Sequence, residues 1–548
     1  MLIGDVIAQR AALHPDRVYW EQEAARVTYG QMEHAANRVA RALRAGGPGA
    51  PLAPGDHVAI CGETDWAYAA VHFGAAKAGL VLVHLNPGLP AGELARLIAH
   101  SDARLLLAGA RAKRALAGLG QAGAMLPPVV TLPGSDEEAE AEKEGDPAAA
   151  PWRVTPWEEW LAPHGGEPPP APSIGPGTPF QMLYTSGTTG APKGVLIPHR
   201  AKLRQGMTHR MNLALEPGHR VLSALPLHHQ YAQWLLLVTV PLAGATAVVH
   251  ARFDAAAAWS ALAGGDITHL PLVPTTLYRL LEFAQANPGS AKAPALHCIV
   301  YGGAAVDATR LPQVRRVFPG ARLFQGFGQT ETGYCMGLHD AHHESHPHSL
   351  GLADVFSEVR LRTPDGAEAA IGEVGEIVAR TPYLMLGYYK NPGATAEYFA
   401  HGEGWGRTGD LARRDAEGFF TLVGRVDDML ISGGVNVHPE AVEQALAAHP
   451  AVRECAVVGA PHPEWGQQVA AVVCTVGGRE LDAALVAELE AHCRERLAPH
   501  QCPRQWRQAA ELPRTHSGKV RRFVLARHFA GEHADAESEQ SATDDSAG

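Results

Sequence analysis

A run of small hydroxyl residues and glycines that ends in a lysine constrains this chain most. Residues 184–195 read YTSGTTGAPKGV, and an apolar stretch follows to residue 197. Glycines let backbone N–H groups approach an anion, hydroxyls donate hydrogen bonds to it, and Lys193 adds a positive charge. The run predicts a loop that binds a polyphosphate and leads into a strand. It is not a Walker-type loop, because Lys193 follows a proline and no Gly-Lys-Ser/Thr sequence opens a helix.

The segments that precede this run alternate between helical and strand-like patterns. Helical patterns cover residues 29–43, 66–78 and 91–100, and short apolar runs lie at 56–61 and 80–83. This alternation predicts an α/β fold in which helices cover a parallel or mixed sheet. The alternation resumes after the phosphate loop and continues to about residue 424.

Two segments lack such a pattern. Residues 132–176 are rich in Pro, Glu, Ala and Gly, which predicts a mobile surface insertion. Residues 531–548 are acidic and contain no Lys, Arg or large apolar residue. This composition predicts a disordered acidic tail.

The net charge and the cysteine content indicate which partners and which cellular compartment to expect. The net charge of −11 argues against a nucleic-acid partner, and the seven cysteines, with no Cys-X-X-Cys pair, predict free thiols in a reducing compartment. The N-terminus shows no secretory signal. The most apolar stretch, residues 235–249, contains Pro241 and is shorter than the roughly 20 residues that span a membrane, so we expect a buried strand–turn–strand there. These observations predict a cytoplasmic protein with no membrane partner.

Three further motifs carry chemistry. Residues 325–333, QGFGQTETG, follow a strand-like segment, and Glu331 beside a phosphate loop is suited to Mg²⁺, although alone it would more often cap a helix. Residues 407–410, RTGD, form a turn whose carboxylate can accept both hydroxyls of a ribose. Residues 424–440, GRVDDMLISGGVNVHPE, form the third motif.

The order of these motifs, with Lys519 after them, resembles the adenylate-forming superfamily of acyl-CoA synthetases, nonribosomal adenylation domains and firefly-type luciferases. The resemblance covers the chain outside the 132–176 segment and the tail. It implies a reaction in two steps. A carboxylate attacks the α-phosphorus of ATP, giving an acyl-adenylate and pyrophosphate, and a thiol, usually that of CoA, then displaces AMP.

The resemblance also implies roles for individual residues. Thr185 and Glu331 would coordinate Mg²⁺, and Lys519 would be the adenylation lysine that neutralises charge at phosphorus. The residues implied in binding the nucleotide are Thr185, Ser186, Gly187, Thr188, Thr189, Gly190 and Lys193 at the phosphates, Gly302, Gly303, Ala304, Phe327, Gly328 and Thr330 near the adenine, and Asp410 and Arg425 at the ribose.

The family architecture implies a large N-terminal domain of helix-covered β-sheets, residues 1–426, and a small mobile α+β C-terminal lid domain, residues 427–530. Asp427 matches the hinge about which the small domain rotates between the two half-reactions. One face of that domain would deliver Lys519. The other face, near Gly433 and Gly434, would build the tunnel for the thiol.

Within the superfamily, residues 356–360, 424–440 and 465–467 look most like aryl-CoA ligases of the 4-chlorobenzoate type. Trp465 and Arg504 then match positions that contact CoA, although Trp465 is equally well explained as a half-buried core indole. Gly88, His500 and Cys502 depart from that pattern, so a different or weaker grip on the CoA nucleotide is expected. CoA is the favoured thiol because no carrier-protein domain follows Lys519.

The loop PLHHQY at residues 226–231 matches a segment that closes on the acyl group, with His229 at a gating position. Its polar side chains favour a small aromatic, heteroaromatic or short cyclic acid such as benzoate or furoate. A medium-chain fatty acid, or a stand-alone enzyme that loads a carrier protein, is the alternative, and a homodimer is left open. The histidine-rich tract at residues 339–348 is interpreted as a solvated loop, with a metal site as the alternative.

Overall fold

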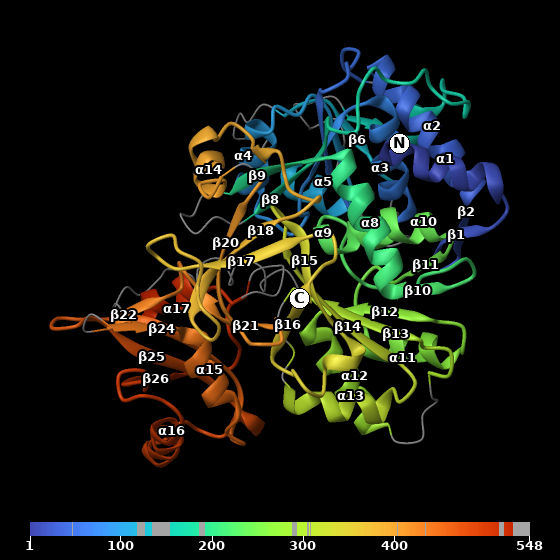
Figure 1. Ribbon diagram of the computed structural model, residues 1–548. Helices are drawn as coiled ribbons and strands as arrows, with labels where there is room; N and C mark the ends of the chain where they lie inside the picture. The colour runs from blue at the N-terminus through green and yellow to red at the C-terminus, as the bar shows by residue number, and fades with distance from the viewer. Residues whose placement is uncertain are drawn as a thin grey trace. The chain divides into compact units, whose positions relative to one another are not determined.

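The computed structural model describes residues 1–46, 48–117, 126–133, 154–185, 192–287, 293–303, 306, 308–402, 404–432, 435–514 and 520–529. The chain divides into two compact units (Figure 1). Unit 1 consists of Met1–Val359 and Val378–Thr408, and unit 2 of Arg360–Ile377 and Gly409–Gly548. Asp427 therefore lies inside unit 2, in a turn, and its role as a hinge stays a prediction.

The first sheet of unit 1 is parallel from β7 to β8 and ends in two antiparallel strands. Its order is β7 (Val154–Pro156), β6 (Val129–Thr131), β5 (Leu106–Ala108), β3 (His57–Cys61), β4 (Val81–His84), β8 (Pro179–Thr185), β9 (Lys193–Pro198) and β19 (Gly387–Tyr388). The strands predicted at 56–61, 80–83 and after the phosphate loop are confirmed.

The second sheet of unit 1 is parallel from β1 to β14 and antiparallel at both ends. Its order is β2 (Ala25–Thr28), β1 (Val18–Gln22), β11 (Thr246–Val249), β10 (Arg220–Ser223), β12 (His269–Leu272), β13 (Cys298–Gly302), β14 (Arg322–Gln329), β15 (Gly333–His339) and β16 (Ser349–Ala353).

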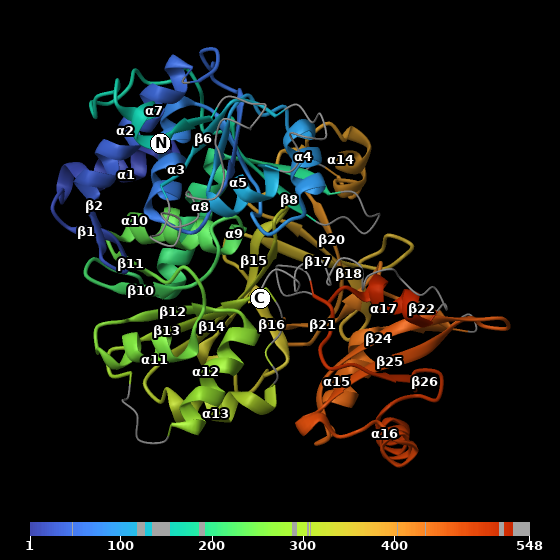
Figure 2. The ribbon, with the colours of Figure 1, turned by 180° about the vertical axis from the view of Figure 1, so that it is seen from behind.

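Successive side chains of a β-strand point to opposite faces of its sheet, so alternate residues pack into different hydrophobic cores. Val58 and Ile60 of β3 join a large core, shared with the second sheet, that contains α1 (Ile3–Leu13), α2 (Tyr29–Ala45), α3 (Trp66–Ala78), α8 (His199–Leu213) and the π-helix η3 (Gln233–Thr239). Ala59 and Cys61 face α4 (Ala91–His100) and α5 (Ala110–Ala117) on the other side (Figure 2).

The second sheet is covered on its other face by α11 (Ala255–Ala263), α12 (Pro274–Ala286) and α13 (Leu311–Val317). Short elements complete the described part of unit 1: α7 (Trp157–Leu161), α9 (Gln230–Ala232), α10 (Val240–Ala243), η4 (Ala308–Arg310), η5 (Asp340–His342) and α14 (Pro392–Tyr398).

Local capping explains where the first long helices begin and end. Thr28 accepts a hydrogen bond from the Gln31 N–H, and the Gln31 side chain accepts one from the Thr28 N–H, which forms a capping box at α2. Asp65 caps α3 through the Tyr68 N–H at 2.7 Å. The helices predicted at 29–43, 66–78 and 91–100 are confirmed.

Two sequence expectations fail in unit 1. Residues 235–249 form η3, α10 and β11 in place of a strand–turn–strand, because Gly244, at φ +74°, ends a helix rather than a hairpin. Within the 132–176 segment, residues 154–161 form β7 and α7, and Trp157 and Trp160 are buried in the large core. These residues are therefore a folded sheet edge and not a surface insertion.

Unit 2 contains a mixed sheet in the order β23 (Val435–Val437), β22 (Leu430–Ser432), β25 (Gly466–Thr475) and β24 (Val452–His462), with β26 (Gln505–Gln508) parallel to β25. Helices α15 (Pro439–Ala447) and α16 (Ala483–Arg496) cover one face, and α17 (Arg522–Phe529) covers the other. The turn η6 (Val476–Gly478) follows β25. Antiparallel strands β20 (Gly406–Arg414) and β21 (Phe420–Arg425) precede this sheet, and β17 (Glu358–Arg362) and β18 (Val374–Arg380) lie where the chain passes between units.

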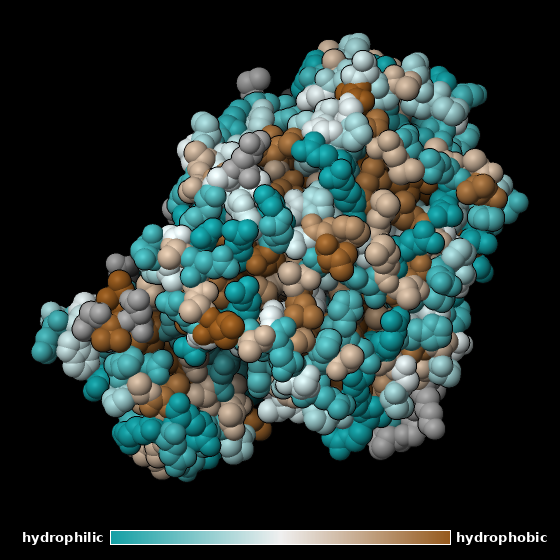
Figure 3. All heavy atoms as spheres, in the orientation of Figure 1, coloured by the Kyte–Doolittle hydropathy of each residue, from teal (hydrophilic) through white to brown (hydrophobic). Residues whose placement is uncertain are grey.

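The predicted fold class, a large N-terminal part of helix-covered sheets with a smaller α+β C-terminal part, is confirmed. Within the described residues, no helix has both the length and the apolar character that crossing a membrane requires. The face drawn in Figure 3 is largely hydrophilic, with apolar residues scattered over it.

Candidate active site

The predicted phosphate loop connects the two strands of a β-hairpin. Thr185, the last residue of β8, pairs with Lys193, the first residue of β9, and Tyr184 pairs with Gly194. Residues 186–191, which include the predicted Ser186, Gly187, Thr188, Thr189 and Gly190, lie outside the described residues. The base of the hairpin therefore presents a hydroxyl and an ammonium group at the carboxyl end of β8.

Glu331 meets this hairpin base. It lies in the turn between β14 and β15, and its Oε1 accepts hydrogen bonds from Thr185 Oγ1 at 3.2 Å and Tyr388 Oη at 3.1 Å. The Lys193 ammonium lies 5.2 Å from the centre of the Tyr388 ring. The structure thus joins the two predicted magnesium ligands and the phosphate-loop lysine in one cluster.

Tyr388 is a member of this cluster that the sequence motifs did not indicate. It lies on β19, where it pairs with Val195 of β9. The pairing of these two strands places Tyr388 close to Lys193, which precedes Val195 on β9. Burial, followed by the charge and hydrogen bond of Glu331, raises the pKa of Tyr388 well above its ordinary value. The phenol therefore stays protonated and donates to the carboxylate.

The residues predicted near the adenine gather at the carboxyl ends of two parallel strands. Gly302 of β13 pairs with Gly326 of β14, and Phe327 and Gly328 follow directly. A Cβ at Gly302 would lie 2.8 Å from the Gly326 carbonyl oxygen, so only glycine allows this approach. Gly303 continues with φ +82°, and Ala304 lies outside the described residues.

Thr330 precedes Glu331 in the same turn and is half-buried. The turn is fixed from both sides, because Thr332 Oγ1 accepts a hydrogen bond from the Gln329 N–H at 3.0 Å and the Glu331 carbonyl accepts one from the Met385 N–H at 2.8 Å. The carboxylate of Glu331 is therefore presented by a rigid backbone.

The loop at residues 226–231 adjoins the second sheet. The ring centres of His228 and His229 lie 4.3 Å apart, and both side chains are half-buried. The Tyr231 hydroxyl donates to the Val300 carbonyl at 3.0 Å, so it is committed to the sheet and does not add polarity to an acyl pocket. His229 and Gln230 are the residues of this loop that keep the predicted polar character.

One residue of the histidine-rich tract, His343, contacts the strand that leads to the predicted adenine site. His343 is buried, and its Nε2 lies 2.8 Å from the hydroxyl of Tyr301, a residue of β13 directly before Gly302. Within the described ranges, no group of three or more His, Cys, Asp or Glu side chains is arranged to hold a metal ion. The interpretation of a fully solvated loop is thus wrong for His343.

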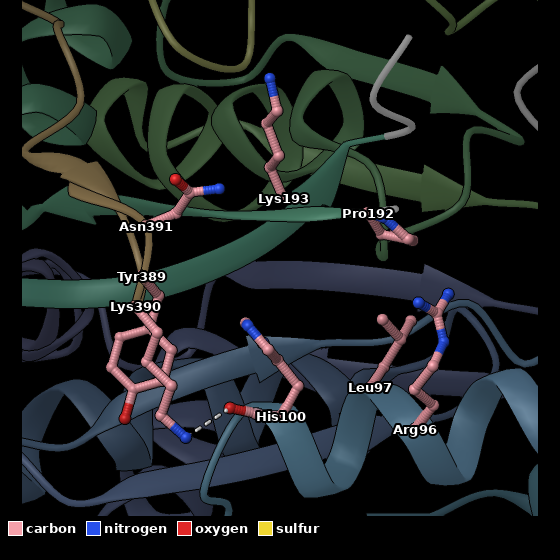
Figure 4. A pocket seen from close by; sticks show the side chains of 8 residues that line it. All are labelled: Arg96, Leu97, His100, Pro192, Lys193, Tyr389, Lys390 and Asn391. Carbon is pink, nitrogen blue, oxygen red and sulfur yellow. Dashed lines mark hydrogen bonds between the residues drawn. The ribbon is translucent and has the colours of Figure 1, made fainter. Parts of the chain in front are cut away.

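A basic pocket of about 210 Å³ lies next to Lys193 (Figure 4). Arg96 and His100 of α4 and Lys390 contribute to its lining. Lys390 Nζ donates to the His100 carbonyl at 3.1 Å and forms an ion pair with Asp102 at 2.7 Å. The pocket therefore offers positive charge beside the predicted phosphate site, part of it already neutralised.

In unit 2, the two residues predicted at the ribose lie side by side. Asp410 of β20 pairs with Arg425 of β21, and Arg425 Nε lies 3.5 Å from Asp410 Oδ1. Asp410 is buried, and the preceding Gly409 N–H donates to Glu376 at 3.1 Å. A carboxylate fixed in this way is preorganised to accept hydroxyl groups.

Lys519 falls in residues 515–519, outside the described residues, but the segments on either side are fixed. Arg514 and Val520 form an antiparallel bridge. Arg522, at the start of α17, donates two hydrogen bonds to Glu443, at 2.8 and 2.7 Å. The described residues on either side of Lys519 are therefore tied to unit 2.

The predicted CoA-side residues also come together in unit 2. The Trp465 ring is half-buried and lies between the stacked His462 ring, 4.3 Å between centres, and the Arg504 guanidinium, 4.7 Å from its centre. Gly433 and Gly434 fall between β22 and β23 in the sequence, outside the described residues. The stack brings the Arg504 guanidinium against Trp465 at the turn of the β24–β25 hairpin.

The sequence matches known families over most of its length. Residues 7–389 match the AMP-binding enzyme family, and residues 441–519 match the AMP-binding enzyme C-terminal domain. Sulfoacetate–CoA ligase from Cupriavidus necator is 33% identical over 539 residues, covering 96% of this chain and 97% of that protein. Feruloyl-CoA synthase from an Amycolatopsis species is 32% identical over 528 residues, covering 96% and 99%.

A solved structure agrees with these relatives. The o-succinylbenzoate CoA synthetase from Bacillus subtilis, in complex with its acyl-adenylate intermediate, superposes with a TM-score of 0.78 at 27% identity, covering 95% of this chain and 97% of that chain. The chain therefore belongs to the AMP-binding enzyme family and is an AMP-forming acid–thiol ligase.

Proposed function

We propose that this protein joins a small aromatic, heteroaromatic or short cyclic carboxylic acid to CoA, with ATP as the energy source and an acyl-adenylate as the intermediate. The observation that carries the proposal is the contact of Thr185 and Tyr388 with Glu331 at the base of the phosphate hairpin. This cluster combines acidic and hydroxyl oxygens with the nearby ammonium of Lys193. Such a set suits a magnesium–polyphosphate.

Adenylate formation needs positioning more than acid–base chemistry. The carboxylate nucleophile is already charged, so catalysis consists of aligning it with the α-phosphorus and stabilising charge there. Thr185 and Glu331 fit Mg²⁺ because hydroxyl and carboxylate oxygens are the ligands it prefers, and bound Mg²⁺ would supply charge neutralisation at the phosphates. Lys519 would hold the α-phosphate and the attacking carboxylate together. Pyrophosphate leaves toward Lys193 and the 186–191 segment.

Two sets of residues are proposed to bind the nucleoside. Gly302, Gly303, Ala304, Phe327, Gly328 and Thr330 would line the adenine. Asp410 would accept the ribose hydroxyls, and Arg425 Nε lies 3.5 Å from its Oδ1 in an ion pair. The close approach of Gly302 to Gly326 supports this assignment, because it leaves the strand ends free of side chains.

The second half-reaction would use the other face of the C-terminal domain. Rotation about Asp427 would carry Lys519 away and bring Gly433, Gly434, Trp465 and Arg504 to the thiol. The Trp465–Arg504 stack supports a role in CoA binding, since the ring positions a guanidinium that can bind a phosphate of CoA. The relatives named as CoA ligases support CoA as the thiol.

The acid is proposed from the loop at residues 226–231 and from the relatives. His229 and Gln230 give this loop more polarity than a fatty-acid channel needs. Feruloyl-CoA synthase and o-succinylbenzoate CoA synthetase are named for acids that contain an aromatic ring. His229 would gate the acyl group next to the carboxyl ends of β13 and β14.

A carboxylate panel scored by pyrophosphate release tests the proposal. Benzoate, 2-furoate, cyclopentanecarboxylate, hexanoate and decanoate are each given to the protein with ATP and Mg²⁺, with and without CoA. Acid-dependent pyrophosphate release with the ring acids, and AMP release that rises with CoA, are expected. Preference for decanoate would contradict the acid class, and AMP release that does not respond to CoA would contradict the thiol.

A further inference from the structure

Helix α8 exposes apolar side chains to solvent and buries a lysine. Its outward positions include the exposed methionines Met207 and Met211, whereas Lys202 is turned inward and is only 1% exposed. Within the described residues, the Lys202 Nζ has no hydrogen-bond partner. An unpaired buried ammonium is costly, so the position calls for a compensating group.

The charge of Lys202 acts on two buried histidines, His72 and His84. His72 of α3 and His84 of β4 have ring centres 6.1 Å apart. Both nitrogens of His72 and Nε2 of His84 have no partner among the described residues, while His84 Nδ1 lies 2.7 Å from the Tyr68 hydroxyl. Each neutral imidazole carries one N–H donor and one acceptor nitrogen, so among the described residues His72 has an unpaired donor in addition to that of Lys202, and Nε2 of His84 is also unpaired.

The three members of the cluster are nitrogen bases whose pKa values are lowered by burial. Burial lowers the pKa of Lys202 to about 7, and burial followed by the charge of Lys202 lowers the pKa of His72 to about 3. Burial, His72 and Lys202 also lower the pKa of His84. In the described parts of the chain, no carboxylate forms an ion pair with Lys202 or offsets its shift. A group that accepts hydrogen bonds, and an anion in particular, would pair with a protonated Lys202, whereas a cation would repel it.

Helix α8, which carries Lys202, contacts the loop at residues 226–231. Gln205, one turn after Lys202 on α8, accepts a hydrogen bond from Gln230 at 3.5 Å. His228 is among the charges that act on His84. Further along α8, His209 stacks on Trp234, with 3.7 Å between ring centres. The basic cluster and the loop assigned to the acyl group thus share one region of unit 1.

We propose that Lys202, with His72 and His84, binds a second anionic group, a carboxylate or sulfonate, at the far end of the acid that this ligase activates. The inference rests on the proposed acyl role of the 226–231 loop. The distal group would accept hydrogen bonds from Lys202 Nζ and an imidazole N–H, which pairs the buried donors. An acid that lacks this group would leave them unpaired and is disfavoured for that reason. Lys202 is then a specificity-determining residue.

Matched acids that differ only in the distal group test this role. Benzoate is compared with isophthalate and 3-sulfobenzoate, and propionate with succinate, by kcat/KM for pyrophosphate release. The variants are Lys202→Met, which keeps the length of the side chain, and Arg204→Met, which removes a charge from an exposed position of the same helix.

In the wild-type protein, at least one doubly acidic member is expected to exceed its partner by tenfold or more. Lys202→Met should lose at least tenfold on that acid, with little change for its singly acidic partner, and Arg204→Met should change neither. An equal effect of Lys202→Met on both members of every pair would overturn the proposal, as would a wild-type preference for the singly acidic member of every pair.

Binding without turnover separates this inference from the proposed function. Thermal unfolding of the wild-type protein is followed with 3-sulfobenzoate, with benzoate and with sulfate, each without ATP. A rise in Tm that is specific to 3-sulfobenzoate and absent in Lys202→Met supports the site even if no acid releases pyrophosphate. An equal rise with sulfate, or no rise in the wild type, assigns the cluster to a free anion or to water and overturns the proposal. If Lys202→Met does not fold, Lys202→Arg must retain the preference.

Discussion

Thr185 and Glu331 are 146 residues apart in the sequence, yet the Thr185 hydroxyl donates to the Glu331 carboxylate at 3.2 Å. One residue ends β8 of the first sheet, and the other follows β14 of the second. The contact therefore ties the two sheets together at the ends from which the phosphate loop and the β14–β15 turn emerge. It places the carboxylate proposed to bind Mg²⁺ at the base of the hairpin proposed to bind phosphates, as the proposed adenylate formation requires.

Replacing Glu331 by Gln keeps the shape of the side chain and removes its charge. We expect pyrophosphate release to fall by about 10²–10³, since the amide no longer holds a divalent cation against the phosphates. The measurement is kcat/KM for ATP over a range of Mg²⁺ concentrations. Glu344→Gln, at an exposed position of the histidine-rich tract, is the control, and equal loss in both variants would contradict the role of Glu331.

Tyr388→Phe removes one hydrogen bond to Glu331 and keeps the ring beside Lys193. A hydrogen bond to a charged group contributes about 1.5–3 kcal/mol, so a fall of about ten- to a hundredfold in kcat/KM for ATP is expected, together with a higher Mg²⁺ requirement. Tyr389→Phe is the matched control, because its hydroxyl donates to the surface residue Asp102. A larger effect in Tyr389→Phe than in Tyr388→Phe would rule out the proposed support of Glu331.

Lys519→Ala should separate the two half-reactions. Adenylate formation is expected to fall by about 10²–10³, because the positive charge at the α-phosphate is lost. Conversion of a supplied acyl-adenylate and CoA to the thioester should continue at a rate near that of the wild type. Both rates are measured by quenched flow with the same acid. Equal loss of both would show that Lys519 is not specific to adenylation.

Asp427→Pro tests the hinge, because it should impair the second half-reaction and spare the first. Proline fixes φ near −65°, which would prevent the backbone rotation that the second half-reaction needs. Pyrophosphate release in the absence of CoA should be retained, while thioester formation falls by at least tenfold. Asp428→Ala, at the neighbouring residue, removes an acid without restricting φ and should affect thioester formation less. Normal thioester formation in Asp427→Pro would disprove the hinge.

The stability of unit 2 should depend on the protonation of Glu440. Burial raises the pKa of Glu440 from 4.5 to about 7, although the neighbouring Arg522 opposes this shift. Between these values the folded chain holds a proton that the unfolded chain has lost, so the free energy of unfolding decreases as the pH rises from 4.5 to 7 and then levels off. The decrease is on the order of 1–3 kcal/mol.

Urea unfolding followed at pH 5 and pH 8 measures this dependence. Glu440→Gln should reduce the difference between the two pH values, since its amide does not titrate. Glu488→Gln, a half-exposed acid on α16, should leave the difference unchanged. The same difference in wild type and Glu440→Gln would show that another group is responsible.

Much of this arrangement could be predicted from local sequence patterns. The phosphate run and the motif around Glu331 carry their chemistry in consecutive residues, and Asp65 and Thr28 mark the starts of helices directly. Tyr388 could not be found in this way, because its place beside Glu331 depends on pairing between β9 and β19, which lie far apart in the sequence.

Lys202 escaped prediction for a different reason. Helix α8 contains many polar residues, and such a pattern normally indicates a solvated helix. Its burial depends on neighbouring elements such as η3 and α10, which no local periodicity encodes. His343 was misplaced for a related reason, since only the fold brings it against Tyr301. The composition of the 132–176 segment predicts an insertion that includes residues 154–161. Composition alone does not indicate that Trp157 and Trp160 are buried.

The fate of the carboxylate oxygens tests the central claim most directly. The acid that gives the highest pyrophosphate release in the panel is labelled with ¹⁸O in both carboxyl oxygens and supplied with ATP and CoA. If the carboxylate attacks the α-phosphorus and the thiol then displaces AMP, mass spectrometry will find one ¹⁸O atom in AMP and none in pyrophosphate. Unlabelled AMP, or label in inorganic phosphate, would contradict an acyl-adenylate route.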